Sequence, residues 1–134
     1  MKVDVIVERG KDSLFSVNMD YYEFDFGLSG FGKTAEEAIT DFYQCWEEAK
    51  EMCEKDGKEI PQLEFNIQYD VTSFLNYYAD ILSKSGLEKI TGINQKQLWH
   101  YSSGKRHPKT ATIKKIQERL HCFAEDLLQV QFVN

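Results

Sequence analysis

Apolar and polar residues alternate with a period of two in three stretches near the start of the chain, over residues 3–7, 14–19 and 22–28. Such alternation is typical of strands with one buried face. The inward-facing residues are expected to be Val3, Val5 and Val7, then Phe15, Val17 and Met19, and then Tyr22, Phe24, Phe26 and Leu28. Because short links join the three stretches, we expect an antiparallel meander.

The period of the apolar residues changes to 3.6 after residue 34, which indicates an amphipathic helix. Thr34 and Glu37 form a capping box, so the helix is expected to begin at Thr34. It should end near Asp56 and Gly57, since glycine suits the position that follows a helix. The apolar stripe consists of Ala35, Ala38, Ile39, Phe42, Trp46, Ala49 and Cys53. Residues 63–69 alternate again, which predicts a fourth strand and a β-β-β-α-β order.

From residue 72 onward the pattern is helical. The expected helices cover residues 74–82, 85–91 and 95–103, followed by a fourth helix that Pro108 and Thr110 open. Gly92 and Gly104 are suited to end the second and third of these, and Asn94 can cap the third. The apolar tail at residues 127–133 fits a short strand or a last turn. The sequence therefore predicts an α+β fold with two domains, residues 1–69 and 70–134.

The two halves of the chain carry opposite net charges. Residues 1–70 hold seven Lys/Arg and seventeen Asp/Glu, a net charge of −10, whereas residues 71–134 hold nine and five, a net charge of +4. Two modules with differently charged partners explain this asymmetry, although two solvated surfaces of different composition are the plainer alternative. With 42% apolar and 28% charged residues, the chain of 134 residues is expected to be globular.

The sequence offers no sign of export or membrane insertion. No stretch approaches the roughly 18–20 apolar residues of a membrane span, and the first residues do not resemble a signal peptide. The three cysteines, Cys45, Cys53 and Cys122, cannot all pair and match no metal-binding spacing. We therefore expect a cytoplasmic protein with no contact to a membrane and no metal ion.

Residues 87–106, LEKITGINQKQLWHYSSGKR, have the pattern of two short helices joined by a tight turn. Leu87, Ile93, Leu98 and Tyr101 are spaced to pack the two helices together. The polar residues expected on the outward face of the second helix are Gln95, Lys96, Gln97 and His100. Glutamine can pair bidentately with adenine and lysine can donate to guanine, while Lys105 and Arg106 can neutralise phosphates. The pattern predicts a DNA-binding helix-turn-helix, with an ordinary helical hairpin as the alternative.

This segment resembles the Xre/Cro–C1 repressor family of helix-turn-helix proteins over residues 87–127. The resemblance implies a helix-capping role for Asn94, a base or phosphate contact for Gln95, base reading by Lys96 and His100, and a phosphate contact for Gln97. Two residues depart from the family pattern: Glu88 stands where a small alanine is usual, and Trp99 is large and apolar beside the reading face. Since one recognition helix reads few base pairs, a homodimer or higher homo-oligomer on a palindromic operator is expected.

The first module resembles HicB-type antitoxins over residues 1–65. The resemblance rests on MKVDVIVERG, on GKTAEEAITDFYQCWEEAKEMCEKDGKEIPQ and on the β-β-β-α-β order, and residues 22–26 depart from the family's third strand. It implies a partial RNase-H-like fold that covers the active site of a small, basic HicA-type mRNA-cleaving toxin, which a module of net charge −10 suits. The expected function is that of an antitoxin that also represses its own operon; a stand-alone helix-turn-helix regulator is the alternative.

Residues 27–34, GLSGFGKT, match the phosphate-binding pattern GxxxxGK[ST] between a strand and a helix. However, the preceding stretch alternates rather than being apolar throughout, and Thr34 serves better as a helix cap. We interpret the segment as a glycine-rich bend and keep a nucleotide-binding protein as a remote alternative. Asp4, Asp25 and Asp70 show no clustered metal-binding spacing. No catalytic residue and no cofactor are therefore predicted.

Overall fold

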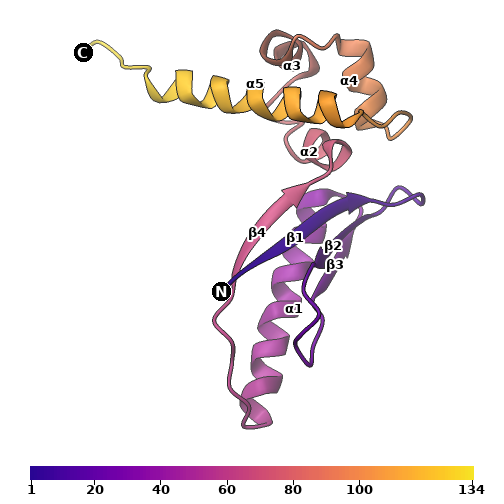
Figure 1. Ribbon diagram of the computed structural model, residues 1–134, viewed down its shortest axis with the longest axis vertical. Helices are drawn as coiled ribbons and strands as arrows, with labels where there is room; N and C mark the ends of the chain where they lie inside the picture. The colour runs from indigo at the N-terminus through magenta and orange to yellow at the C-terminus, as the bar shows by residue number, and fades with distance from the viewer. The chain divides into compact units, whose positions relative to one another are not determined.

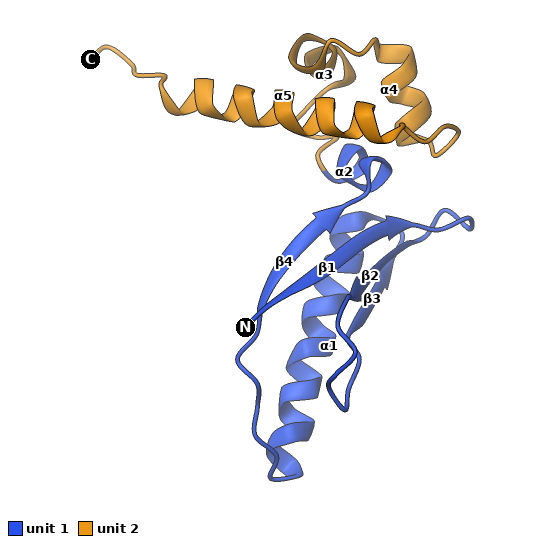
Figure 2. Cartoon of the chain, in the orientation of Figure 1, with its two compact units in different colours: residues 1–77 blue, residues 78–134 orange.

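The computed structural model describes all of residues 1–134 as a mixed α/β chain with one four-stranded sheet and five helices (Figure 1). The chain forms two compact units, unit 1 at Met1–Tyr77 and unit 2 at Tyr78–Asn134 (Figure 2). The sequence pattern instead predicts a division between residues 69 and 70. The units divide later because helix α2, Val71–Tyr77, packs on the helix and two of the strands of unit 1.

The sheet of unit 1 has the strand order β3-β2-β1-β4. Its strands are β1 at Lys2–Arg9, β2 at Phe15–Met19, β3 at Ser29–Gly32 and β4 at Glu64–Tyr69. Strand β2 pairs antiparallel with both β1 and β3, so the predicted meander is confirmed. Strand β4 lies parallel to β1, with Val5 beside Ile67, because the long helix α1 carries the chain across the sheet before β4 begins.

The third strand lies later in the chain than predicted. Residues 22–28 alternate as a strand would, yet β3 occupies Ser29–Gly32 and residues 21–28 are irregular. The rings of Phe24 and Phe26 stack with centroids 5.1 Å apart, and Phe26 lies 6.0 Å from Trp46. The alternation therefore reflects aromatic side chains of a loop that pack against α1 and one another, which needs no strand ladder.

Helix α1, Ala35–Lys55, begins and ends where the sequence predicts. The Thr34 hydroxyl accepts the backbone N–H of Glu37 at 3.1 Å, and the Glu37 carboxylate accepts the N–H of Lys33 at 2.8 Å. At the other end Gly57 adopts a left-handed conformation with φ 65°. The buried core that α1 shares with the sheet consists of Val3, Val5, Val7, Phe15, Val17, Met19, Leu28, Ala35, Ala38, Phe42 and Trp46.

Two glycines of β3 allow α1 to approach the sheet closely. A Cβ atom on Gly30 would lie 2.2 Å from the carbonyl oxygen of Ala38 and 2.3 Å from the backbone nitrogen of Phe42. A Cβ atom on Gly32 would lie 2.7 Å from the backbone nitrogen of Ala38. Backbone atoms of α1 are among the nearest neighbours at both positions, so Gly30 and Gly32 of the GLSGFGKT segment have a packing role.

The second half of the chain is helical, with bounds that differ in part from the prediction. The helix expected over residues 74–82 is replaced by α2, which starts where the carboxylate of Asp70 accepts the N–H of Ser73 at 2.7 Å and ends at Tyr77. Unit 2 contains α3 at Lys84–Thr91, α4 at Gln95–Ser102 and α5 at Thr110–Leu128. Residues 127 and 128 complete α5, and the rest of the apolar tail forms neither strand nor helix. None of the helices combines the length and the apolar character that crossing a membrane requires.

Candidate nucleic-acid interface

The turn between α3 and α4 is fixed by three local devices. Gly92 ends α3 with φ 76°, and its N–H donates to the carbonyl of Glu88 at 2.8 Å. The side chain of Asn94 caps α4 by accepting the N–H of Gln97 at 2.8 Å. The buried hydroxyl of Thr91 donates to the carbonyl of Leu87 and accepts the N–H of Ile93. These bonds hold α4 in one orientation to α3.

A small apolar cluster holds the three helices of unit 2 together. Leu98 and Tyr101 of α4 are buried, as are Leu87 of α3 and Ile116 of α5. Leu98 and Tyr101 are three residues apart, so one face of α4 points into this cluster and the other faces solvent. The predicted packing roles of Leu87, Leu98 and Tyr101 are thus confirmed, while Ile93 is half-buried.

The exposed face of α4 differs from the predicted one in its composition. Gln95 and Lys96 are exposed as expected, but Gln97 and His100 are half-buried. The indole of Trp99 is 58% exposed and lies between Gln95 and Lys96 around the helix. At about 100° per residue, Lys96 lies nearest the centre of the face opposite the buried pair Leu98 and Tyr101, with Trp99 and His100 on either side of it. Of these two neighbours, Trp99 is the more exposed. The helical periodicity of the sequence already places Trp99 on the exposed side of α4. The prediction placed Trp99 beside the reading face.

Gln95 and the half-buried Gln97 both make hydrogen bonds within unit 2. The amide nitrogen of Gln95 donates to the Glu88 carboxylate at 3.1 Å, which links α4 to α3 across the turn. The amide nitrogen of Gln97 donates to the Tyr101 hydroxyl at 2.9 Å, along the flank of α4. Glu88, which departs from the family pattern, thus holds Gln95. Gln97 keeps its side-chain oxygen as an acceptor.

His100 lies beside a concentration of positive charge. Its Nδ1 atom is buried and has no hydrogen-bond partner in unit 2. Burial lowers the pKa of His100 below its ordinary value of 6.5, and the charges of Lys105, Arg106 and Lys96 lower it further. The imidazole is therefore neutral at neutral pH, and the cationic character of this surface comes from lysine and arginine.

The two basic residues after α4 are held close to its end by a backbone turn. Gly104 has φ 77°, and the N–H of Arg106 donates to the carbonyl of His100 at 3.2 Å. Lys105 and Arg106 are both exposed. Helix α5 adds further exposed cations, and the ammonium of Lys115 lies 3.7 Å from the point that a Cβ on Gly92 would occupy. The predicted DNA-contacting residues thus gather on one module, around α4.

Three polar groups of the GLSGFGKT segment are bonded within unit 1. The N–H of Phe31 donates to the carboxylate of Asp41 at 2.9 Å, and that of Lys33 donates to Glu37. The Thr34 hydroxyl is committed to the cap of α1. Acidic side chains thus occupy the position in front of this loop, where they would repel a nucleotide.

Asp4, Asp25 and Asp70 each bind a partner within unit 1. Asp4 accepts from the side chain of Asn66 at 2.8 Å, Asp25 pairs with Lys58, and Asp70 caps α2. No group of three or more His, Cys, Asp or Glu side chains is arranged to hold a metal ion.

Comparisons with protein-family models, curated proteins and solved structures give no match to this chain.

Proposed function

We propose that unit 2 is a helix-turn-helix that binds operator DNA, with α4 as the recognition helix in the major groove. The observation that carries the proposal is the fixed α3–turn–α4 arrangement, whose exposed α4 face stands among the cations Lys96, Lys105 and Arg106. An α-helix fits the major groove, and its first residues reach base edges. Lysine and arginine beside it bind phosphates and fix the register of the helix on the duplex.

In the proposed complex the residues of α4 have different tasks. Lys96 donates to guanine, and Gln95 reads adenine after exchanging its bond to Glu88 for one to the base. Trp99 offers an apolar surface that suits the methyl group of thymine. Gln97 and the first N–H groups of α4 contact a phosphate, with Asn94 keeping the helix end in shape. His100 supports the face from its half-buried position and contributes a neutral contact.

We propose that two copies of the chain dimerise through α5 and bind a palindromic operator together. The apolar stripe of this helix starts at Ile116, which is buried, and continues through Leu120, Phe123 and Leu127, of which the last two are exposed. Figure 1 shows the second half of α5 extending past α3 and α4. A second copy of the same stripe would cover this face in a self-complementary contact and place two recognition helices on one duplex.

Unit 1 is proposed to bind and block a HicA-type toxin, so that the whole chain acts as a cytoplasmic antitoxin that represses its own operon. Its support is the resemblance of residues 1–65 to HicB-type antitoxins, the observed β-β-β-α-β order and the acidic surface of α1. A cationic toxin would be attracted to this surface over a distance of about a Debye length, some 8–10 Å.

Two measurements test the two halves of the proposal separately. Fluorescence anisotropy of the full chain on the DNA upstream of its gene and on random DNA should show tighter, salt-dependent binding to the former. Expression of the small neighbouring reading frame should arrest growth, and co-expression of this chain should relieve the arrest. Specific DNA binding without any growth arrest would favour the stand-alone regulator. Relief of arrest without DNA binding would favour an antitoxin that does not repress its operon.

A further inference from the structure

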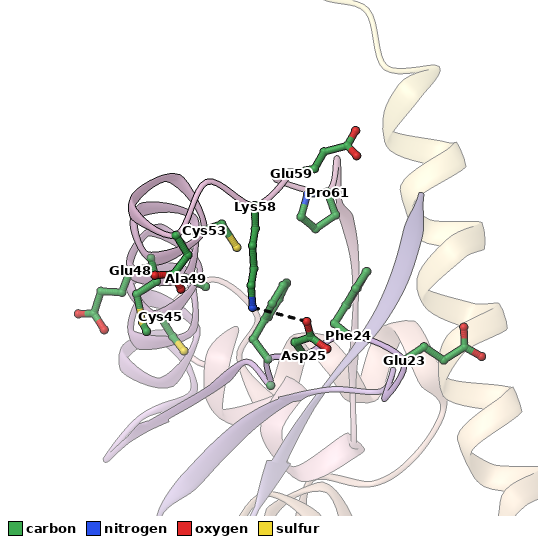
Figure 3. Close-up of a pocket in the computed structure, with 14 residues that line it drawn as sticks. Glu23, Phe24, Asp25, Cys45, Glu48, Ala49, Cys53, Lys58, Glu59 and Pro61 are labelled. Carbon is green, nitrogen blue, oxygen red and sulfur yellow. Dashed lines mark ion pairs between the residues drawn. The ribbon is translucent and has the colours of Figure 1, made fainter.

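A groove of about 920 Å³ lies in unit 1 beside the second half of α1 (Figure 3). Helix α1 forms one wall, and the irregular segments at residues 23–27 and 56–61 form the others. The apolar lining includes Phe24, Phe26, Cys45, Ala49, Cys53 and Pro61. This space accommodates several side chains at once, and the residues that shape it are far apart in the sequence.

Carboxylates accompany this apolar lining at the margins of the groove. Glu23, Asp25, Glu48, Asp56 and Glu59 border the groove, and Lys58 is the one cation among the residues that line it. In Figure 3 the side chains of Glu23, Glu48 and Glu59 point away from the centre of the groove at its margins. A partner seated on the apolar lining would therefore meet negative charge around its edge.

Lys58 reaches across the groove to Asp25 in a contact that a partner can replace. Its ammonium lies 3.7 Å from the carboxylate of Asp25, which joins the two irregular segments across the groove (Figure 3). The two side chains are 59% and 89% exposed, so the pair is screened by water and weak. A cation of an incoming segment can take the place of Lys58 at Asp25 at little cost.

We infer that this groove is the docking site for a basic amphipathic segment of a partner protein, with apolar side chains on the groove lining and lysine or arginine facing the acidic rim. The charge pattern favours this occupant, since an acidic or neutral segment would leave the rim carboxylates unpaired. The inference rests on the proposed function only in taking the toxin as the protein that supplies the segment. The groove and its charges do not depend on that identification.

The test uses the full chain and a fluorescein-labelled synthetic peptide of lysine and leucine, with all leucines on one helical face. A scrambled peptide of the same composition serves as the control for unspecific attraction. Asp25→Lys should weaken binding about tenfold, whereas Glu51→Lys, an equal charge change on α1 outside the groove, should weaken it less than about twofold. Lys58→Ala should tighten binding about threefold and Lys55→Ala should leave it unchanged.

The outcomes separate the groove from the proposed function. The groove is supported as a docking site, even where no toxin exists, by two results together. The amphipathic peptide should bind more tightly than the scrambled one, and the two variants of each matched pair should differ as expected. Loss of growth rescue in Asp25→Lys but not in Glu51→Lys assigns the groove to the toxin. Equal effects of Asp25→Lys and Glu51→Lys on both the peptide and the growth rescue overturn the groove and leave the antitoxin function standing.

Discussion

The two units bury their apolar residues to very different extents. Unit 1 packs eleven buried residues between α1 and the sheet. Unit 2 has only Leu87, Leu98, Tyr101 and Ile116 as buried apolar side chains. It also exposes large apolar residues along the end of α5 and its tail, among them Leu127, Leu128, Val130, Phe132 and Val133. The difference indicates that unit 1 has the larger core of its own, whereas the end of unit 2 has a run of exposed apolar residues that an assembly can cover.

The charges of the two units differ as much as their cores. The acidic residues of unit 1 lie on the outer face of α1 and around the groove, while the cations of unit 2 gather around α4 and along α5. A strongly basic surface suits the phosphates of DNA and a strongly acidic one suits a basic protein. The contrast therefore supports two partners of opposite charge on one chain.

The variant with the largest expected effect tests whether the close packing between α1 and β3 stabilises unit 1. Gly30→Ala places a Cβ atom 2.2 Å from a backbone oxygen of α1, and the helix has to move. We expect a loss of about 3 kcal/mol, at the upper end for an overpacked core. Urea unfolding followed by tryptophan fluorescence measures it in a Trp99→Phe background, where Trp46 is the remaining tryptophan. Gly27→Ala is the matched control, because a Cβ there meets nothing within 4 Å; equal stability of the two variants would contradict the packing role.

Unit 2 should depend on each of its few buried residues. Leu98→Ala removes a fully buried side chain and is expected to cost about 2–3 kcal/mol, in the lower part of the range for such truncations because a small unit can partly collapse around the change. Circular dichroism during urea unfolding should show an earlier transition of unit 2 and no change in that of unit 1. Ile81→Ala, at a 75% exposed position before α3, is the control and should leave the transition in place.

Several features of the fold followed from the sequence because they depend on neighbours in the chain. The cap at Thr34, the stop at Gly57 and the turn at Gly92 and Asn94 are all local, and all are present in the structure. The third strand was misplaced because aromatic residues that pack from a loop can alternate like those of a strand. Local pattern alone does not separate these two causes.

The candidate sites could be predicted less well, because they depend on side-chain contacts that a sequence pattern does not show. The bond between Gln95 and Glu88 joins two helices across a turn, and its geometry decides which polar groups remain available on α4. The groove of unit 1 combines residues 23–27, 45–53 and 56–61, which only the folded chain brings together. Helical periodicity did place Leu98 and Tyr101 in the core, and the same periodicity locates Trp99 on the exposed face.

The exposed stripe of α5 gives a way to test whether unit 2 is incomplete as a monomer. Phe123→Ala should weaken the proposed homodimer by about 1–2 kcal/mol, because each of the two copies buries only the 37% of Phe123 that is exposed. Analytical ultracentrifugation over a range of concentrations measures the change. Gln117→Ala, at an exposed polar position of α5, should not alter the equilibrium. A wild-type chain that stays monomeric at all concentrations would refute the contact.

The recognition helix and the phosphate contacts should respond differently to substitution. Lys96→Ala and Gln95→Ala are expected to cost roughly 1–3 kcal/mol on the preferred operator only. Lys105→Ala should weaken binding to all sequences alike and reduce the salt dependence by about one released ion. Anisotropy titrations at several salt concentrations separate the two patterns. Equal losses on operator and random DNA for both classes of variant would remove α4 from base reading.

The smallest effect concerns the pH dependence of unit 2. Because burial and the nearby cations lower the pKa of His100 in the folded chain, the unfolded chain binds a proton more readily. Stability from the neutral imidazole is therefore complete above the ordinary pKa of 6.5 and declines as the pH falls below it. Urea unfolding of unit 2 at about pH 7.5 and about pH 5.5 should show this decline in the wild-type chain. His100→Gln should reduce it, whereas the exposed His107→Gln should not; an unchanged pH dependence in His100→Gln would show that the charged ring is tolerated beside Lys105 and Arg106.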